Sequence, residues 1–197
     1  MNLLSFSTLL PLAGETLRAP RRTFARLMEL PVGREALWQA LLLVVVLSIL
    51  LAEATNLLLF AAETDGPAGP GFAAPFIFGA IQFVVLLSTV FLIDGVGRKF
   101  GGTGDLRGAL LAVTWLQFIM VCLQVVQSVV ILLVPSLGAL VVTAGLVLFL
   151  VLLTCFVAEL HGFSSLGRVF GMILFVLVGV GLALSLIATL AGVTVSR

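Results

Sequence analysis

The chain has 197 residues, of which 61% are hydrophobic and 10% charged, and its mean hydropathy is +1.32. A soluble domain carries about 25% charged residues because water must solvate its surface, so this composition excludes a soluble enzyme and a disordered chain. The net charge of +1 offers no basic excess to a nucleic acid. We therefore expect an integral membrane protein without a nucleic-acid partner.

The first segment, residues 1–35, contains a short amphipathic pattern. Between residues 20 and 30, apolar and basic residues recur at helical spacing on opposite faces, with a proline at the start and another just after the end. Such a helix is expected to lie flat in the membrane interface, its arginines near anionic headgroups. The residues of this N-terminal arm that we expect to face lipid or a partner are Arg21, Arg22, Phe24, Arg26 and Leu27. The arm either only anchors the bundle or also binds a cytoplasmic protein.

Five apolar stretches follow, each near the roughly 20 residues that a helix needs to cross the hydrocarbon core. They are predicted at residues 36–60, 75–95, 109–134, 138–160 and 169–193. Only residues 135–137 separate the third stretch from the fourth, so these two must form a tight antiparallel hairpin. None of these stretches alternates polar and apolar residues, as the strands of a membrane β-barrel do. The predicted fold class is an all-α integral membrane protein, with a five-helix bundle over residues 36–197.

The basic residues indicate how the bundle is oriented. Nine of the ten Lys and Arg residues lie in the N-terminal segment, in the loop after the second span and in the loop after the fourth span. On the other side, the loop 61–74 and the turn 135–137 have no basic residue, and the C-terminal tail has only Arg197. Positive charge is retained on the cytoplasmic side. The N-terminus is therefore predicted to be cytoplasmic and the C-terminus external. Lys99 is the only lysine, a bias that favours a GC-rich bacterial genome and hence the bacterial cytoplasmic membrane.

Polar side chains within the spans raise a question of function, because they are costly in hydrocarbon. Glu53 lies about 25 Å along the first span, with Asn56 on the same face. The third span has a polar stripe that includes Thr114 and Ser128, with Gln127 beside it. The candidate intramembrane polar site consists of Glu53, Asn56, Gln82, Gln117 and Gln124. Hydrogen bonds between helices and a polar path for a solute or cation both explain these residues.

A second group of polar residues lies where spans end on the predicted cytoplasmic side. Its members are Asp94, Arg98, Glu159, His161 and Arg168. They are interpreted as charges that pair at helix ends, or as a polar cluster. Metal binding is not favoured, since the spacing of Glu159 and His161 turns them about 200° apart on a helix. In the fifth span, Gly181, Ser185 and Thr189 repeat every four residues and predict a close helix contact, within one chain or between two.

The sequence shows no pattern of catalytic chemistry. No Ser-His-Asp, Cys-His or paired-carboxylate arrangement is present, and Cys122 and Cys155 lie in apolar runs. We expect no enzyme and no cofactor.

Three segments together resemble the bacterial branch of the Yip family of multi-span membrane proteins, named for Ypt/Rab-interacting proteins. They are residues 20–27 (PRRTFARL), 97–104 (GRKFGGTG) before a span with Thr114 and Trp115, and 160–165 (LHGFSS). The resemblance implies a polytopic bundle with a cytoplasmic N-terminus. Eukaryotic members are associated with small GTPases and carry Tyr-containing motifs, whereas this chain has no Tyr, so GTPase binding is disfavoured.

The sequence is compatible with two functions. The first is a non-enzymatic scaffold, accessory or membrane-organising protein with a membrane-protein partner or a homo-oligomeric state. The alternative is a small transporter or channel component that uses Glu53, Asn56 and the stripe with Gln117 and Gln124.

Overall fold

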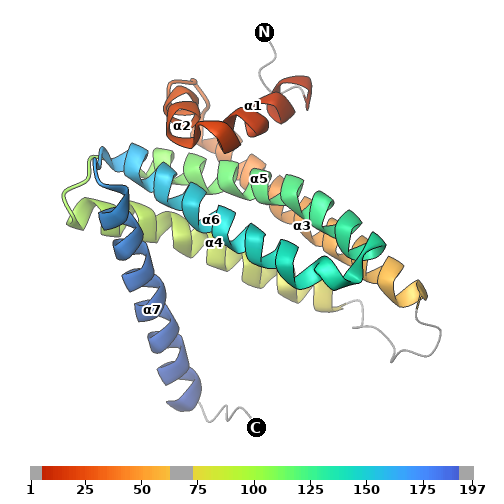
Figure 1. Cartoon of the computed structure of the whole chain (residues 1–197). Helices are drawn as coiled ribbons and strands as arrows, with labels where there is room; N and C mark the ends of the chain where they lie inside the picture. Colours follow the sequence, from red (N-terminus) through yellow and green to blue (C-terminus); the bar gives the residue numbers. More distant parts are fainter. Residues whose placement is uncertain (1–5, 63–72, 191–197) are drawn as a thin grey trace.

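The computed structural model describes residues 6–62 and 73–190 (Figure 1). Most of the loop 61–74, the end of the predicted fifth span and the tail with Arg197 therefore lie outside the described residues. All regular structure in the described ranges is helical. The helices are α1 (Phe6–Arg18), α2 (Pro20–Met28), α3 (Arg34–Ala62), α4 (Ala73–Lys99), α5 (Leu106–Leu133), the 3-10 turn η1 (Pro135–Leu137), α6 (Gly138–His161) and α7 (Leu166–Leu190).

Five of these helices, α3 to α7, are long and apolar enough to cross a membrane. Only 11% to 33% of each span's most apolar stretch is buried inside the chain, so most of the apolar surface faces outward, where lipid must cover it. The all-α class is confirmed, and the chain is a multi-pass membrane protein. The α5–α6 hairpin turns through η1, as the proline at position 135 predicts.

The bundle is organised around α5, which packs against α3, α4 and α6. These four helices run side by side, whereas α7 diverges from them and packs chiefly against α6 (Figure 1). We call the end with the α4–α5 and α6–α7 loops, residues 100–105 and 162–165, the basic end. The far end is the end with η1. Each loop at the basic end contains a glycine in the left-handed backbone conformation, Gly101 with φ 85° and Gly162 with φ 69°.

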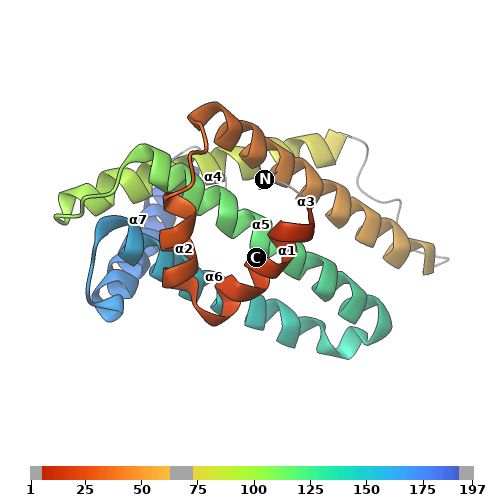
Figure 2. The same ribbon diagram turned by 90° about the horizontal axis from the view of Figure 1, so that it is seen from above.

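The N-terminal segment is more structured than the amphipathic pattern predicts. It forms two helices, α1 and α2, that lie across α5 and α6 (Figure 2). Phe24 and Leu27 are 0% and 6% exposed, and Phe24 stacks on Phe156 of α6 with 4.7 Å between ring centroids. The prediction that these two residues face lipid is therefore wrong. Apolar spacing on one face specifies a buried face, but α6 rather than the bilayer covers it.

The arm is also tied down by polar contacts. Arg21 Nε donates to Glu159 Oε2 at 2.8 Å, and Trp115 Nε1 donates to Thr16 Oγ1 at 3.1 Å. Arg26 pairs with Glu15 within the arm itself. Two of the three arginines predicted to reach headgroups thus have protein partners, because carboxylates lie within reach of them in the folded chain. Arg22 remains exposed.

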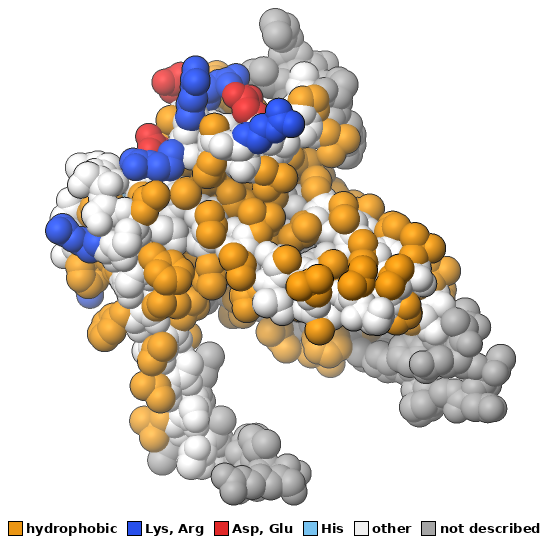
Figure 3. Space-filling model, in the orientation of Figure 1, with side chains coloured by type: hydrophobic (Ala, Val, Ile, Leu, Met, Phe, Trp, Pro, Cys, Tyr) orange, Lys and Arg blue, Asp and Glu red, His pale blue; other side chains and the backbone are white. Residues whose placement is uncertain are grey.

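Packing is uneven along the bundle. The largest fully buried side chains, among them Phe24, Leu41, Val90, Leu110 and Phe156, all belong to α1, α2 or the parts of the spans nearest the basic end. We call this part the basic half and the remainder the far half. Lys and Arg side chains gather over the arm and at the basic end, while the far half presents mainly apolar side chains (Figure 3).

Candidate functional site

The far half contains a cavity of about 250 Å³ between α3, α4 and α5, which we call the polar cavity. All five residues of the predicted intramembrane site lie on its wall: Glu53, Asn56, Gln82, Gln117 and Gln124. Ser48, Ile49, Ala52 and Phe78 complete the lining. Three helices separated in the chain thus bring these polar side chains to one place, which the sequence pattern of each span alone does not specify.

One side of the polar cavity is held by hydrogen bonds. Gln82 Nε2 donates to Ser48 Oγ at 2.9 Å, and Gln124 Nε2 donates to the Ser48 carbonyl at 3.1 Å. Ser48 Oγ in turn donates to the Val45 carbonyl at 2.8 Å. Ser48 is 5% exposed and joins α3 to both neighbours. These contacts correspond to the interhelical hydrogen bonds that the sequence predicts, although Ser48 was not singled out.

The other side of the cavity is unsatisfied. Glu53, Asn56 and Gln117 make no side-chain hydrogen bond or ion pair with any residue that the structure describes. An amide or carboxyl group without a partner costs several kcal/mol in hydrocarbon, on the order of 2–7 for a neutral polar group. Asn56 is exposed and Glu53 and Gln117 are half-buried, so water or a polar ligand that enters from outside the bundle can supply the missing partners.

The cavity lies away from the basic end. Glu53 is about 28 Å along α3 from Arg34, and Gln124 is about 27 Å along α5 from Leu106, at 1.5 Å per residue. Gln117 is closer to the middle of α5. The arrangement combines one carboxyl with several amide oxygens, the ligand type that hard cations prefer. It offers no nucleophile with a neighbouring base.

The rest of the predicted stripe on α5 has other partners. Ser128 accepts a hydrogen bond from Thr55 Oγ1 of α3 at 2.8 Å. Gln127 Nε2 donates to the Val141 carbonyl of α6 at 2.8 Å, within the hairpin. Thr114 is buried and its Oγ1 has no partner in the described part of the chain.

At the basic end, His161 is enclosed by glycines. It is 2% exposed, and a Cβ at Gly97, Gly102 or Gly104 would overlap its ring. Gly104 N–H donates to His161 Nδ1 at 3.1 Å, which assigns the ring proton to Nε2, and Nε2 donates to the Ile93 carbonyl at 3.0 Å. Because both nitrogens are occupied, His161 joins α4, the 100–105 loop and α6 and is not free to act as a base or metal ligand.

The predicted cytoplasmic-side cluster is therefore only partly assembled. Asp94 pairs with Arg98, because α4 continues through Gly95 and Gly97 to Lys99. Glu159 pairs with Arg21 instead, and Arg168 lines a separate cavity beside α7. Asp94 is 6% exposed, and its Oδ1 has no partner among the described residues. Across the described ranges, no three His, Cys, Asp or Glu side chains are grouped as metal ligands.

Sequence reasoning missed a further structural residue, Arg107. Its guanidinium donates to the carbonyls of Leu30 at 2.6 Å and Val32 at 3.1 Å, just after α2. These carbonyls follow a helix end, where acceptors lack intrahelical donors. Only the fold brings them to the first turn of α5, so spacing in the chain gives no signal for this contact.

The predicted packing face of α7 has no partner within the described chain. Gly181, Ser185 and Thr189 are exposed, and no atom lies within 4 Å of a Cβ placed at Gly181. Val169, Met172 and Ile173, on the opposite side of the helix, are the residues of α7 that join the core. The helix contact that this face predicts is therefore not made by the described residues.

The sequence was compared with protein-family models, curated proteins and solved structures. A family model described as the Yip1 domain matches residues 14–187, nearly the whole chain. The chain belongs to the Yip1 family. No curated protein and no solved structure matches it significantly. The Yip1 family is not known as enzymatic. In this member, the segments 97–104 and 160–165 that carry the resemblance contact each other, because the glycines of the first enclose the histidine of the second.

Proposed function

We propose that this Yip1-family protein binds a small cation or polar solute in the polar cavity and acts as a small transporter or channel component. The observation that carries the proposal is the meeting of Glu53, Asn56 and Gln117, without partners in the described chain, in one cavity of about 250 Å³. A bundle that needed polar residues only for packing would pair them, as it pairs Gln82 and Gln124 with Ser48.

The chemistry of the wall favours a cation. Among the described residues that line the cavity, Glu53 is the only ionisable one, and the amide side chains can turn their oxygens toward a positive charge. A monovalent cation with part of its water shell fits this volume and lining. We place the protein in the bacterial cytoplasmic membrane with the basic end in the cytoplasm, following the distribution of its arginines.

Flux through proteoliposomes tests the proposal. The full chain is reconstituted, and the movement of Na⁺, K⁺ and H⁺ is followed separately with ion-sensitive dyes. We expect flux of at least one of these ions above that of empty liposomes, and a loss of tenfold or more in Glu53→Gln. Gln124→Leu, which replaces an amide of the wall, is expected to reduce the flux as well.

Glu35→Gln is the matched control, because it removes the same charge from an exposed position in the first turn of α3. Its flux should equal that of the original chain. Flux that Glu53→Gln and Gln124→Leu both leave unchanged would remove the polar cavity from the pathway.

A scaffold or accessory role is the second candidate, and the divergence of α7 favours it. The face with Gly181 and Ser185 is open, and small residues allow two helix backbones to approach closely. Gentle solubilisation with a size measurement separates the two functions: a stoichiometric membrane-protein partner, or a homo-oligomer that Gly181→Leu disrupts, supports the scaffold. A monomer that carries ions supports the transporter.

A further inference from the structure

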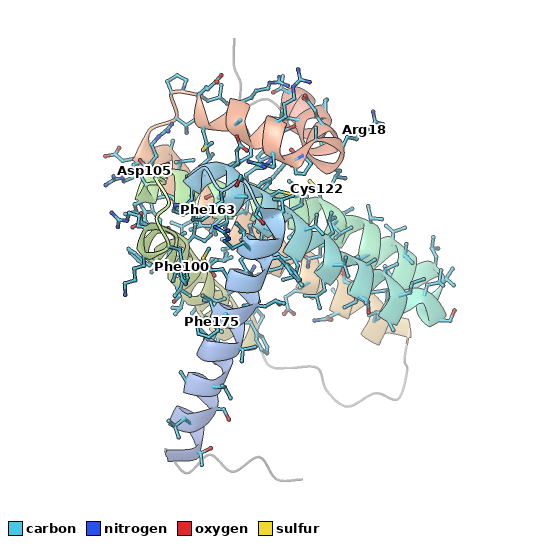
Figure 4. All side chains as sticks on the ribbon, turned by 60° about the vertical axis from the view of Figure 1, so that its left-hand side comes forward. Arg18, Phe100, Asp105, Cys122, Phe163 and Phe175 are labelled. Atoms are coloured by element: carbon cyan, nitrogen blue, oxygen red, sulfur yellow. The ribbon has the colours of Figure 1, made fainter. Side chains whose placement is uncertain are left out.

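A second cavity, of about 520 Å³, lies at the basic end beside α7. We call it the α7 groove. Phe100 follows the end of α4, Phe163 comes from the α6–α7 loop, and the remaining wall comes from the first half of α7. Figure 4 shows Phe163, Phe100 and Phe175 following one another along the side of α7. The groove exists because α7 diverges from the bundle.

The walls of the α7 groove are apolar and open. Phe100 is 59% exposed and Phe175 is 73% exposed. Gly171 adds a stretch of bare backbone, since no atom lies within 4 Å of a Cβ placed there. A ligand with a flexible hydrocarbon chain can therefore contact the aromatic rings and also approach the α7 backbone.

Arg168 is the one cationic residue in the part of this groove's lining that the structure describes. Its side chain is exposed and forms no ion pair with the described residues. Arg18, Arg22 and Arg34 also lack an ion pair there, but they lie outside the groove. The free guanidinium presents paired donors that suit a phosphate.

The dimensions of the groove match one leaflet. From Leu166 at the start of α7 to Phe175 the helix rises about 14 Å, close to half of the roughly 30 Å hydrocarbon core. A helix of a second chain, about 10 Å across, is wider than one hydrocarbon chain and brings no phosphate to the Arg168 guanidinium. A single hydrocarbon chain beneath a charged headgroup fits better.

We propose that the α7 groove is a binding site for one anionic phospholipid of the leaflet at the basic end. The phosphate contacts the Arg168 guanidinium, and an acyl chain lies along Phe100, Met172 and Phe175. This site is separate from the polar cavity and from the N-terminal arm, so it holds whichever of the two functions the protein has.

Photolabelling tests the site on the full chain. The protein is placed in nanodiscs of phosphatidylcholine that contain a few per cent of phosphatidylglycerol with a diazirine in one acyl chain. In a parallel sample, the diazirine chain is carried by phosphatidylcholine. We expect labelling of the peptides with Met172 and Phe175 to be at least threefold higher with phosphatidylglycerol, and Arg168→Gln to reduce it to the phosphatidylcholine level.

Arg34→Gln is the matched control, because Arg34 is exposed and lies outside the groove; it should leave labelling unchanged. Gly171→Leu, which fills the groove from an open helical position, should lower labelling by both lipids without unfolding the chain. Equal labelling by the two lipids, or no effect of Arg168→Gln, would overturn the proposal. Competition by inorganic phosphate would do so too, since it would indicate a site for a free anion instead of a lipid.

Discussion

The basic half and the far half of this bundle differ in how tightly they are packed and in how many of their polar side chains have partners. In the basic half, Phe24, Leu41 and Phe156 are fully buried, and Arg21, Arg107 and His161 each join elements distant in the chain. In the far half, the same helices line a polar cavity in which only some of the polar side chains have hydrogen-bond partners. In the function that we propose, the basic half supplies the rigidity and the far half leaves polar groups available for a ligand.

The lipid environment explains which contacts stabilise the basic half. Apolar helices gain little by packing against one another when acyl chains are equally apolar, so shape and polar contacts determine which helix pairs hold. The glycines around His161 allow close approach, and the buried histidine then satisfies backbone groups on both sides. The polar cavity has a comparable bond network only around Ser48.

The largest effect on stability is expected from Phe24→Ala. Phe24 is fully buried and stacks on Phe156, and truncation of such a ring costs about 3–5 kcal/mol in soluble proteins. We expect about 3 kcal/mol here, because a released arm can place its apolar face in the bilayer. Thermal unfolding in mild detergent measures the change. Leu17→Ala on α1, at an exposed position, should be nearly neutral. If Phe24→Ala were as nearly neutral as Leu17→Ala, the arm would not stabilise the basic half.

A smaller loss is expected from Gly97→Ala. The added Cβ would overlap the His161 ring, so the ring must shift and its bond to the Ile93 carbonyl weakens. Overpacking of this kind costs about 1–3 kcal/mol. Gly95→Ala, two residues earlier on α4 and with no atom near the new Cβ, should instead stabilise the helix by up to about 1 kcal/mol. The opposite signs of these two substitutions, read from thermal unfolding, test the glycine enclosure directly.

The smallest stability effect is expected in the far half. Gln124→Leu removes one interhelical hydrogen bond, worth about 0.6 kcal/mol on average in a membrane bundle, and adds apolar surface that lipid or neighbours accept. The melting temperature should therefore stay close to that of the original chain while flux falls. A melting temperature lowered as far as in Phe24→Ala would mean that the polar cavity is part of the structural core, and the contrast between the halves would disappear.

Several features could be predicted from local patterns. Hydropathy places five spans because the bilayer acts on each stretch separately. The pairing of Asp94 with Arg98 follows from i,i+4 spacing once α4 is known to continue. The enclosure of His161 could not be predicted, because its partner Gly104 lies 57 positions away and a glycine-rich loop has the same composition whether it is free or packed.

The sequence by itself determined the all-α class, the five spans and the positions of the polar residues on them, since each depends on the local run of side chains and the solvent that it meets. Only the tertiary structure decided what those residues face. It turned Phe24 and Leu27 to α6 instead of lipid, and it gathered Glu53, Asn56 and Gln117 into one cavity. A periodic pattern specifies that a face must be covered, but the relative placement of helices decides which surface covers it.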